Sequence, residues 1–194
     1  MPLVSSAVSE RAQPASVGSR EVRLGAVLAV AIAVGFLVWL LFIKGDDNSS
    51  NSGRAKPVAA TPASLRQLAA SSGHSIYWVG RRAGTYELTQ TSDGSIYVRY
   101  LPPGVRLGDS RPNFLTVGTY PHKNALATVR KAARRRGATT LKVNGGGLAV
   151  SNQAQPRSTY LAYKKDPDLL LEVYDPSPAQ SRRTASSGRV VPVR

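Results

Sequence analysis

The sequence contains no cysteine and only two histidines, His74 and His122. Without cysteine there are no disulfides, no thiolate nucleophiles and no cysteine-based metal sites. Neither histidine belongs to an HExxH or His-x-Asp pattern, so we expect both to be surface or loop side chains rather than metal ligands. We expect no metal and no cofactor.

Motifs of catalysis are also missing. There is no GxSxG elbow, and the glycine run at 145–147 lacks both the GxGxxG and GxxxxGK patterns and the helix that should follow, so it predicts a turn. Glu87 and Glu172 each fall in a predicted strand, on the side away from its apolar residues. Two carboxylates can hydrolyse a glycoside when they flank it, but nothing in the sequence brings this pair together. We expect a protein that is not an enzyme.

Acidic residues are few: 11 Asp and Glu stand against 26 Lys and Arg, a formal charge of +15. Such an excess favours anionic partners, namely nucleic acid, phospholipid headgroups or acidic envelope polymers. Nineteen of the 26 cations are Arg, and Ala, Gly and Val are abundant. This bias is typical of a bacterial genome rich in G and C.

The chain has one long apolar run, residues 24–43, with no charge, Asn, Gln or Pro. As a helix it would be about 30 Å long, the thickness of the bilayer core. It leads directly into Lys44 instead of ending in small residues, which favours an uncleaved transmembrane anchor over a signal peptide. Gly25, Ala29 and Ala33 have the spacing of a helix-dimer face, but an ordinary Ala-rich span explains them better than a homodimer.

The charges beside this span favour one orientation. Arg20 and Arg23 precede it closely, whereas only Lys44 follows at once, although wider flanks tie at three cations each. We therefore expect a single-pass protein of the cell membrane. By the positive-inside rule, its N-terminus is cytoplasmic and its C-terminal domain lies outside the cytoplasm.

Composition divides the chain into five parts. They are a disordered tail (1–23), the transmembrane helix (24–43), a flexible linker (44–60), an α+β domain (61–176) and a C-terminal short helix or tail (177–194).

The domain is predicted to be mostly antiparallel, with about eight strands and two or three helices. Thr61 and Pro62 predict the start of a helix that Gly73 ends. Strands are predicted at 75–79, 85–90, 95–101, 114–120, 140–143, 148–151, 159–164 and 169–174. Each half of the domain ends in a strand, a Tyr, a Pro, a helical segment and a Gly, a pattern that either duplication or chance explains.

One hairpin register can be derived. Paired residues share a face of the sheet, and a two-residue turn would place Leu88 opposite Arg99. A three-residue loop at 92–94, with Gly94 left-handed, instead pairs Leu88 with Val98. The same register pairs Tyr86 with Tyr100 and Glu87 with Arg99.

The segment 124–136 predicts the principal helix, with Leu126, Val129 and Ala133 facing inward and Gly137 ending it. Its outer side supplies the candidate anion-binding or partner-binding residues: Arg130, Lys131, Arg134, Arg135 and Arg136. Guanidinium groups offer paired donors to phosphate or carboxylate. The alternative is a solvated face whose cations complement the helix dipole.

These observations lead to three hypotheses. The first is a membrane-anchored, extracytoplasmic, non-catalytic binding or scaffolding module for an envelope protein, an anionic polymer or lipid headgroups. The second reverses the topology and makes the domain a membrane-tethered cytoplasmic nucleic-acid binder. The third, an envelope enzyme, requires Glu87, Glu172, His74 or His122 to converge in a cleft.

Overall fold

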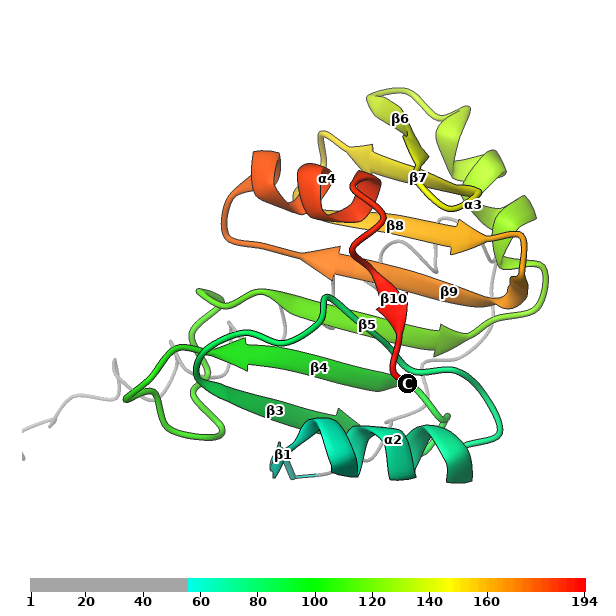
Figure 1. The fold of residues 1–194 in the computed structure, drawn as a ribbon. Coiled ribbons are helices and arrows are strands. Elements are labelled where there is room, and N and C mark those ends of the chain that lie inside the picture. The colour runs from blue at the N-terminus through cyan, green and yellow to red at the C-terminus, as the bar shows by residue number, and fades with distance from the viewer. Residues whose placement is uncertain (1–55) are drawn as a thin grey trace, which may run out of the picture.

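We describe residues 56–194 of the protein in a computed structural model. Eight strands form one sheet in the spatial order β1-β3-β4-β5-β9-β8-β7-β6, and β10 and β2 form a second, two-stranded sheet. Three helices, α2, α3 and α4, complete the domain (Figure 1). The prediction of a mostly antiparallel α+β domain is confirmed.

The bounds of the elements are as follows. The strands are β1 (Val58–Ala60), β2 (Tyr77–Trp78), β3 (Thr85–Gln90), β4 (Ile96–Leu101), β5 (Thr116–Pro121), β6 (Ala138–Val143), β7 (Gly147–Asn152), β8 (Gln155–Tyr163), β9 (Asp166–Tyr174) and β10 (Val191–Pro192). The helices are α2 (Pro62–Ser71), α3 (Ala125–Ala133) and α4 (Pro178–Ser186).

Two antiparallel meanders join at the centre of the large sheet. The first is β3-β4-β5 and the second is β6-β7-β8-β9, and they meet where β5 pairs with β9, from Thr116 opposite Tyr174 to Pro121 opposite Leu169. Thus β1 forms one edge of the sheet and β6 the other.

The predicted register of the β3–β4 hairpin is confirmed. Leu88 lies opposite Val98, and Gly94 in the connecting loop is left-handed with φ of 81°. A glycine adopts this conformation at little cost. The three-residue loop therefore keeps the apolar side chains of both strands on one face.

The helices begin where the sequence indicates. Thr61 caps α2 by accepting a hydrogen bond from Ser64 N at 3.1 Å, and Pro62 occupies the first turn. Ser177 caps α4 in the same way ahead of Pro178. In α3, Val129 is fully buried as predicted, but Ala125 and Ala132 are the other buried residues, and Leu126 and Ala133 are half-buried.

Both faces of the large sheet are covered. Leu65 of α2, Ala185 of α4 and Val193 next to β10 pack on one face in a core that includes Val98, Val117 and Val173. Residues Ala125, Val129 and Ala132 of α3 pack on the other face. The helices that follow β5 and β9 therefore lie on opposite faces of the sheet. A simple duplication would relate these adjacent antiparallel strands by a two-fold axis, and that axis would place both helices on the same face.

The domain is longer at both ends than composition predicted. β1 lies within the stretch 44–60 predicted as linker, and it pairs with β3. The segment 177–194 contributes α4 and β10, and Val193 N donates to Ile76 O at 2.8 Å. Both ends of the described chain thus belong to the folded unit.

Within residues 56–194, no helix is both long and apolar enough to cross a membrane. The predicted tail at 1–23, the predicted span at 24–43 and its Gly25, Ala29 and Ala33 spacing lie outside the described residues.

Candidate functional site

Five cations lie on α3 and the turn after it, and we call them the α3 cluster: Arg130, Lys131, Arg134, Arg135 and Arg136. Four of the side chains are exposed and Arg135 is half-buried. Arg130 and Arg134 are four residues apart on a helical path, so they project from the same side. Since Val129 and Ala132 face the sheet, the cluster faces outward.

The backbone beneath the α3 cluster is fixed by hydrogen bonds to the β7–β8 turn. Asn152 Nδ2 donates to Arg136 O at 3.2 Å, and Gln153 N donates to Gly137 O at 3.1 Å. The prediction that Gly137 ends the helix is wrong, because α3 ends at Ala133 with Arg134 as its C-cap. Gly137, with a φ of 76°, lies in the turn between α3 and β6. The Arg side chains therefore extend from a well-anchored turn.

Carboxylates are scarce in the part of the chain that surrounds the α3 cluster. Residues 56–194 hold 21 Lys and Arg against seven Asp and Glu. Their two ion pairs are Glu87 with Arg99 and Asp109 with Arg111. The C-terminal dipole of a helix supplies only about half a negative charge, which is less than the charge of the four exposed cations Arg130, Lys131, Arg134 and Arg136.

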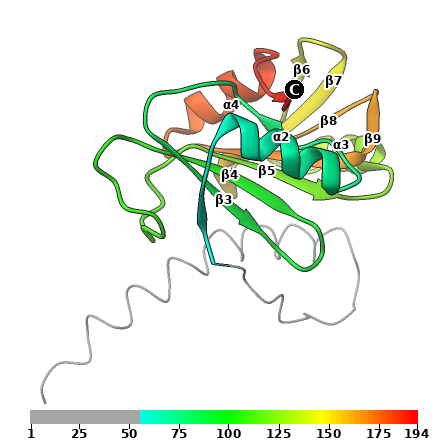
Figure 2. The same cartoon turned by 60° about the horizontal axis from the view of Figure 1, so that its bottom comes forward.

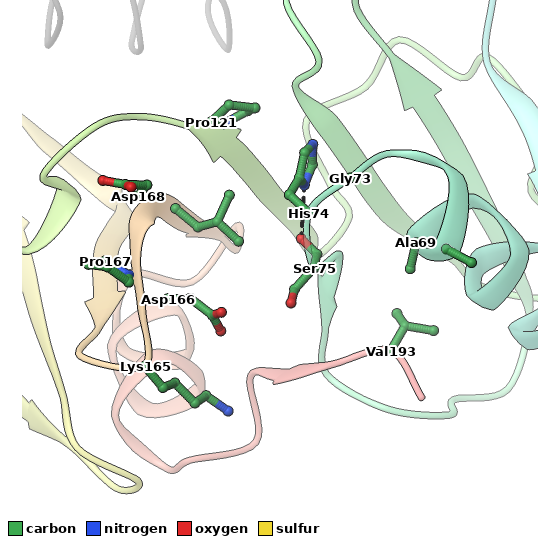
Figure 3. A pocket seen from close by; sticks show the side chains of 12 residues that line it. Ala69, Gly73, His74, Ser75, Pro121, Lys165, Asp166, Pro167, Asp168 and Val193 are labelled. Carbon is green, nitrogen blue, oxygen red and sulfur yellow. Dashed lines mark hydrogen bonds between the residues drawn. The ribbon is translucent and has the colours of Figure 1, made fainter.

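A separate pocket of about 760 Å³ opens beside the β8–β9 turn. His74, Ser75, Lys165 and Asp166 line it, and the Asp166 carboxylate points into it (Figure 3). Tyr77 donates a hydrogen bond to Asp166 Oδ2. Burial, and then this carboxylate, raise the pKa of the Tyr77 phenol above its ordinary value. The pocket thus mixes both charge signs, unlike the α3 cluster.

The remaining polar groups of the pocket have structural partners. Lys165 Nζ lies 5.4 Å from the ring centre of Tyr163 and 5.8 Å from that of Tyr77, within the range of cation–π attraction. Asp168 Oδ1 accepts from Asn124 N at 2.9 Å, at the start of α3. These groups fasten the β8–β9 turn to its neighbours.

The two histidines contact different groups. His74 places its ring nitrogens 3.1 Å from Ser75 O and 3.2 Å from Gly94 O. His122 Nε2 lies 2.9 Å from Thr128 Oγ1, near the start of α3. In the part of the chain that the structure describes, no three His, Asp or Glu side chains are grouped so as to hold a metal ion.

The side of the sheet that carries Glu87 and Glu172 is covered as well, so both side chains are buried. Glu87 is 3% exposed beneath the β4–β5 loop, and Glu172 is 5% exposed. They are three strand spacings apart in the sheet order, about 14 Å.

Glu172 is held by neutral donors alone. Tyr120 Oη and Ser158 Oγ each donate to the carboxylate at 2.5 Å. Burial raises the pKa of Glu172, and this outweighs the opposite effect of the hydrogen bonds from Ser158, Tyr120 and Tyr160. The carboxyl group of Glu172 is therefore bonded within the fold and almost closed off from solvent.

Sequence reasoning identified the α3 cluster but missed the pocket. Tyr77 and Asp166 are 89 positions apart in the chain, and only the completed sheet brings them together. The one signal of the pocket in the sequence was the polar turn between the apolar strands β8 and β9. Comparison of the chain with protein-family models, curated proteins and solved structures finds no match.

Proposed function

We propose that this is a single-pass, membrane-anchored protein whose domain lies outside the cytoplasm and acts as a non-catalytic binding or scaffolding module. The α3 cluster binds an acidic partner, either an envelope protein or an anionic polymer. Residues 24–43 anchor the chain, and the cluster residues supply paired donors to the carboxylates or phosphates of the partner.

One observation carries this proposal: the α3 cluster projects from a fixed turn at the edge of the sheet opposite β1. The chain enters the domain at β1, so a tether from the membrane arrives there. Seven strand spacings separate β1 from β6, about 34 Å. The cluster is thus held far from the tether, where a partner can reach it.

The scattering of the reactive groups supports a non-catalytic role. Glu87 pairs with Arg99, Glu172 is enclosed by hydroxyls, and the two histidines contact different groups, His74 the backbone at Gly94 and His122 the side chain of Thr128. A glycosidase would need two carboxylates on either side of one sugar, about 5 to 9.5 Å apart.

The excess of 14 positive charges in residues 56–194 also favours the second function, a membrane-tethered cytoplasmic nucleic-acid binder. The compartment in which the domain lies distinguishes the two proposed functions. A domain found in the cytoplasm, with DNA or RNA binding that depends steeply on salt, would favour the second one.

The binding test uses the full chain in nanodiscs and polyglutamate as a probe of acidic partners. Replacing the four exposed residues of the cluster, Arg130, Lys131, Arg134 and Arg136, with Gln should weaken binding about tenfold, because four exposed ion contacts contribute about 0.4 kcal/mol each. The matched control replaces four exposed arginines elsewhere with Gln: Arg81, Arg157, Arg183 and Arg189. Equal weakening by both sets would mean that net charge, and not the α3 cluster, binds the probe.

A further inference from the structure

The start of the described chain lies beside the loop that joins β4 to β5. A methyl group built on Gly108 in this loop would lie 3.8 Å from Pro57 Cγ. Figure 2 shows the loop next to β1, where the chain enters the domain. We call the exposed side chains of these two segments the tether-side rim: Lys56, Val58, Arg106, Leu107 and Arg111.

The loop is held in place at three points. Glu87 Oε2 accepts from Gly108 N at 2.5 Å, Arg99 Nη2 donates to Arg111 O at 2.7 Å, and Tyr174 Oη donates to Pro112 O at 2.7 Å. The charged Glu87 and Arg99 thus support the loop from two neighbouring strands. The tether-side rim is therefore a preformed surface.

The tether-side rim combines apolar and basic side chains. Val58 is 51% exposed and Leu107 is 44% exposed, and they are two of the three large hydrophobic residues exposed within residues 56–194. Lys56 and Arg106 are also exposed. Hydrogen bonds from Arg111 lower the pKa of Asp109 to about 2, so this carboxylate stays ionised and offsets Arg111.

Exposed Leu and Val beside Lys and Arg are suited to the boundary of an anionic bilayer, where apolar groups enter the headgroup layer and cations meet lipid phosphates. We propose that the tether-side rim rests on the anionic headgroup surface of the bilayer that anchors the chain. This inference depends on the proposed membrane anchor at 24–43.

Chain length supports this occupant. Fourteen residues lie between the end of the predicted span at 43 and the start of β1 at 58. As the proposed flexible linker, a segment of that length would have a root-mean-square reach of about 20 Å. The tether therefore keeps the rim at a high local concentration near lipid, and a weak surface affinity is enough to orient the domain.

A second copy of the chain is a poorer occupant of the tether-side rim, because it would bring Lys56 and Arg106 against like charges. Seating the rim on lipid also directs the opposite edge, with the α3 cluster, away from the bilayer. The cluster is then left for a protein or polymer.

The absence of cysteine allows a single labelling site in the full chain. Ser110→Cys places a fluorophore on the exposed loop, and Ala127→Cys places one on the exposed side of α3. Each variant is reconstituted at one chain per nanodisc, with phosphatidylglycerol present or with phosphatidylcholine alone. Lipids with a nitroxide on the headgroup quench a fluorophore close to the surface.

With phosphatidylglycerol present, we expect quenching at position 110 to exceed that at 127 by about threefold, and to fall in phosphatidylcholine alone. Lys56→Glu with Arg106→Glu should abolish the difference. Arg130→Glu with Lys131→Glu makes the same change in charge and should leave it intact.

Equally weak quenching at both positions would overturn the inference. A second overturning result would be a change in the fluorescence at position 110 that appears only in vesicles holding many chains, because it would assign the rim to a second copy. Extraction of the chain from membranes by alkaline carbonate would instead overturn the anchor itself, and with it the proposed function. The two failures are therefore distinguishable.

Discussion

Glu87 on β3 lies directly opposite Arg99 on β4, with 2.9 Å between Glu87 Oε1 and Arg99 Nη1. The same carboxylate accepts from Gly108 N, and the same guanidinium lies 4.8 Å from the ring centre of Phe114. This cross-strand pair therefore also supports the loop that carries the tether-side rim.

Glu87→Gln should lower the free energy of unfolding by about 1 to 3 kcal/mol, because the largely buried Arg99 loses its counter-charge. Urea unfolding of the domain in the detergent-solubilised full chain measures this. Asp109→Asn, in the exposed pair with Arg111, serves as the control and should have a much smaller effect. Equal losses in both variants would contradict the supporting role of Glu87.

Gly118→Ala should destabilise the domain by about 1 to 3 kcal/mol. The added Cβ would lie 2.6 Å from Tyr120 Oη, which crosses Gly118 to reach Glu172. The ring atoms Cζ and Cε2 of Tyr120 would also lie 2.8 and 2.9 Å from this Cβ. Tyr120→Ala removes the whole ring and relieves the overlap, so the double variant should lose less stability than the sum of the single ones. Additive losses in a double-mutant cycle would mean that the overlap is relieved by other movements.

Glu172 should make stability fall as the pH rises. Burial raises the pKa of Glu172 in the folded state, so above the ordinary carboxyl value of about 4.5 the unfolded state releases this proton first. The contribution of protonated Glu172 to the free energy of unfolding is complete below that value, and it is lost as the pH rises to the folded-state pKa. Unfolding curves of wild type and Glu172→Gln should show wild type losing stability relative to the variant across this window. A constant difference would contradict the raised pKa.

Val190→Ala should cost about 2 kcal/mol, because this side chain is 1% exposed and packs in the main core. Its neighbour Val191 is 41% exposed, so Val191→Ala should change stability by less than about 0.5 kcal/mol. Thermal or urea unfolding of the two variants compares them. Equal, small effects would mean that the segment after α4 does not belong to the domain.

The sequence predicted the fold where local chemistry determines it. The loop at 92–94 and the alternation in β3 and β4 allow only one register that keeps Leu88 and Val98 on one face. Thr61 and Pro62 start α2 through a local cap. In such places the partners lie within a few residues of each other.

Prediction failed where distant segments determine the structure. β1 and β10 have three and two residues, too few for a visible alternation, and each forms only by pairing with a strand elsewhere. Alternation placed Glu172 on the side of its strand away from the apolar residues, but it did not indicate that α3 and the β4–β5 loop cover that side of the sheet. The α3 cluster was visible because it lies within one helix and turn, whereas the tether-side rim depends on the proximity of Gly108 to Pro57, 51 positions earlier in the chain.

The most direct test of the account is the side of the membrane on which the domain lies. Alkaline phosphatase fused after Arg194 reports an extracytoplasmic C-terminus, and β-galactosidase at the same position reports a cytoplasmic one. We predict an active phosphatase fusion and an inactive galactosidase fusion, with the chain retained in the membrane. An inactive phosphatase fusion with an active galactosidase fusion would contradict the account and favour the nucleic-acid binder.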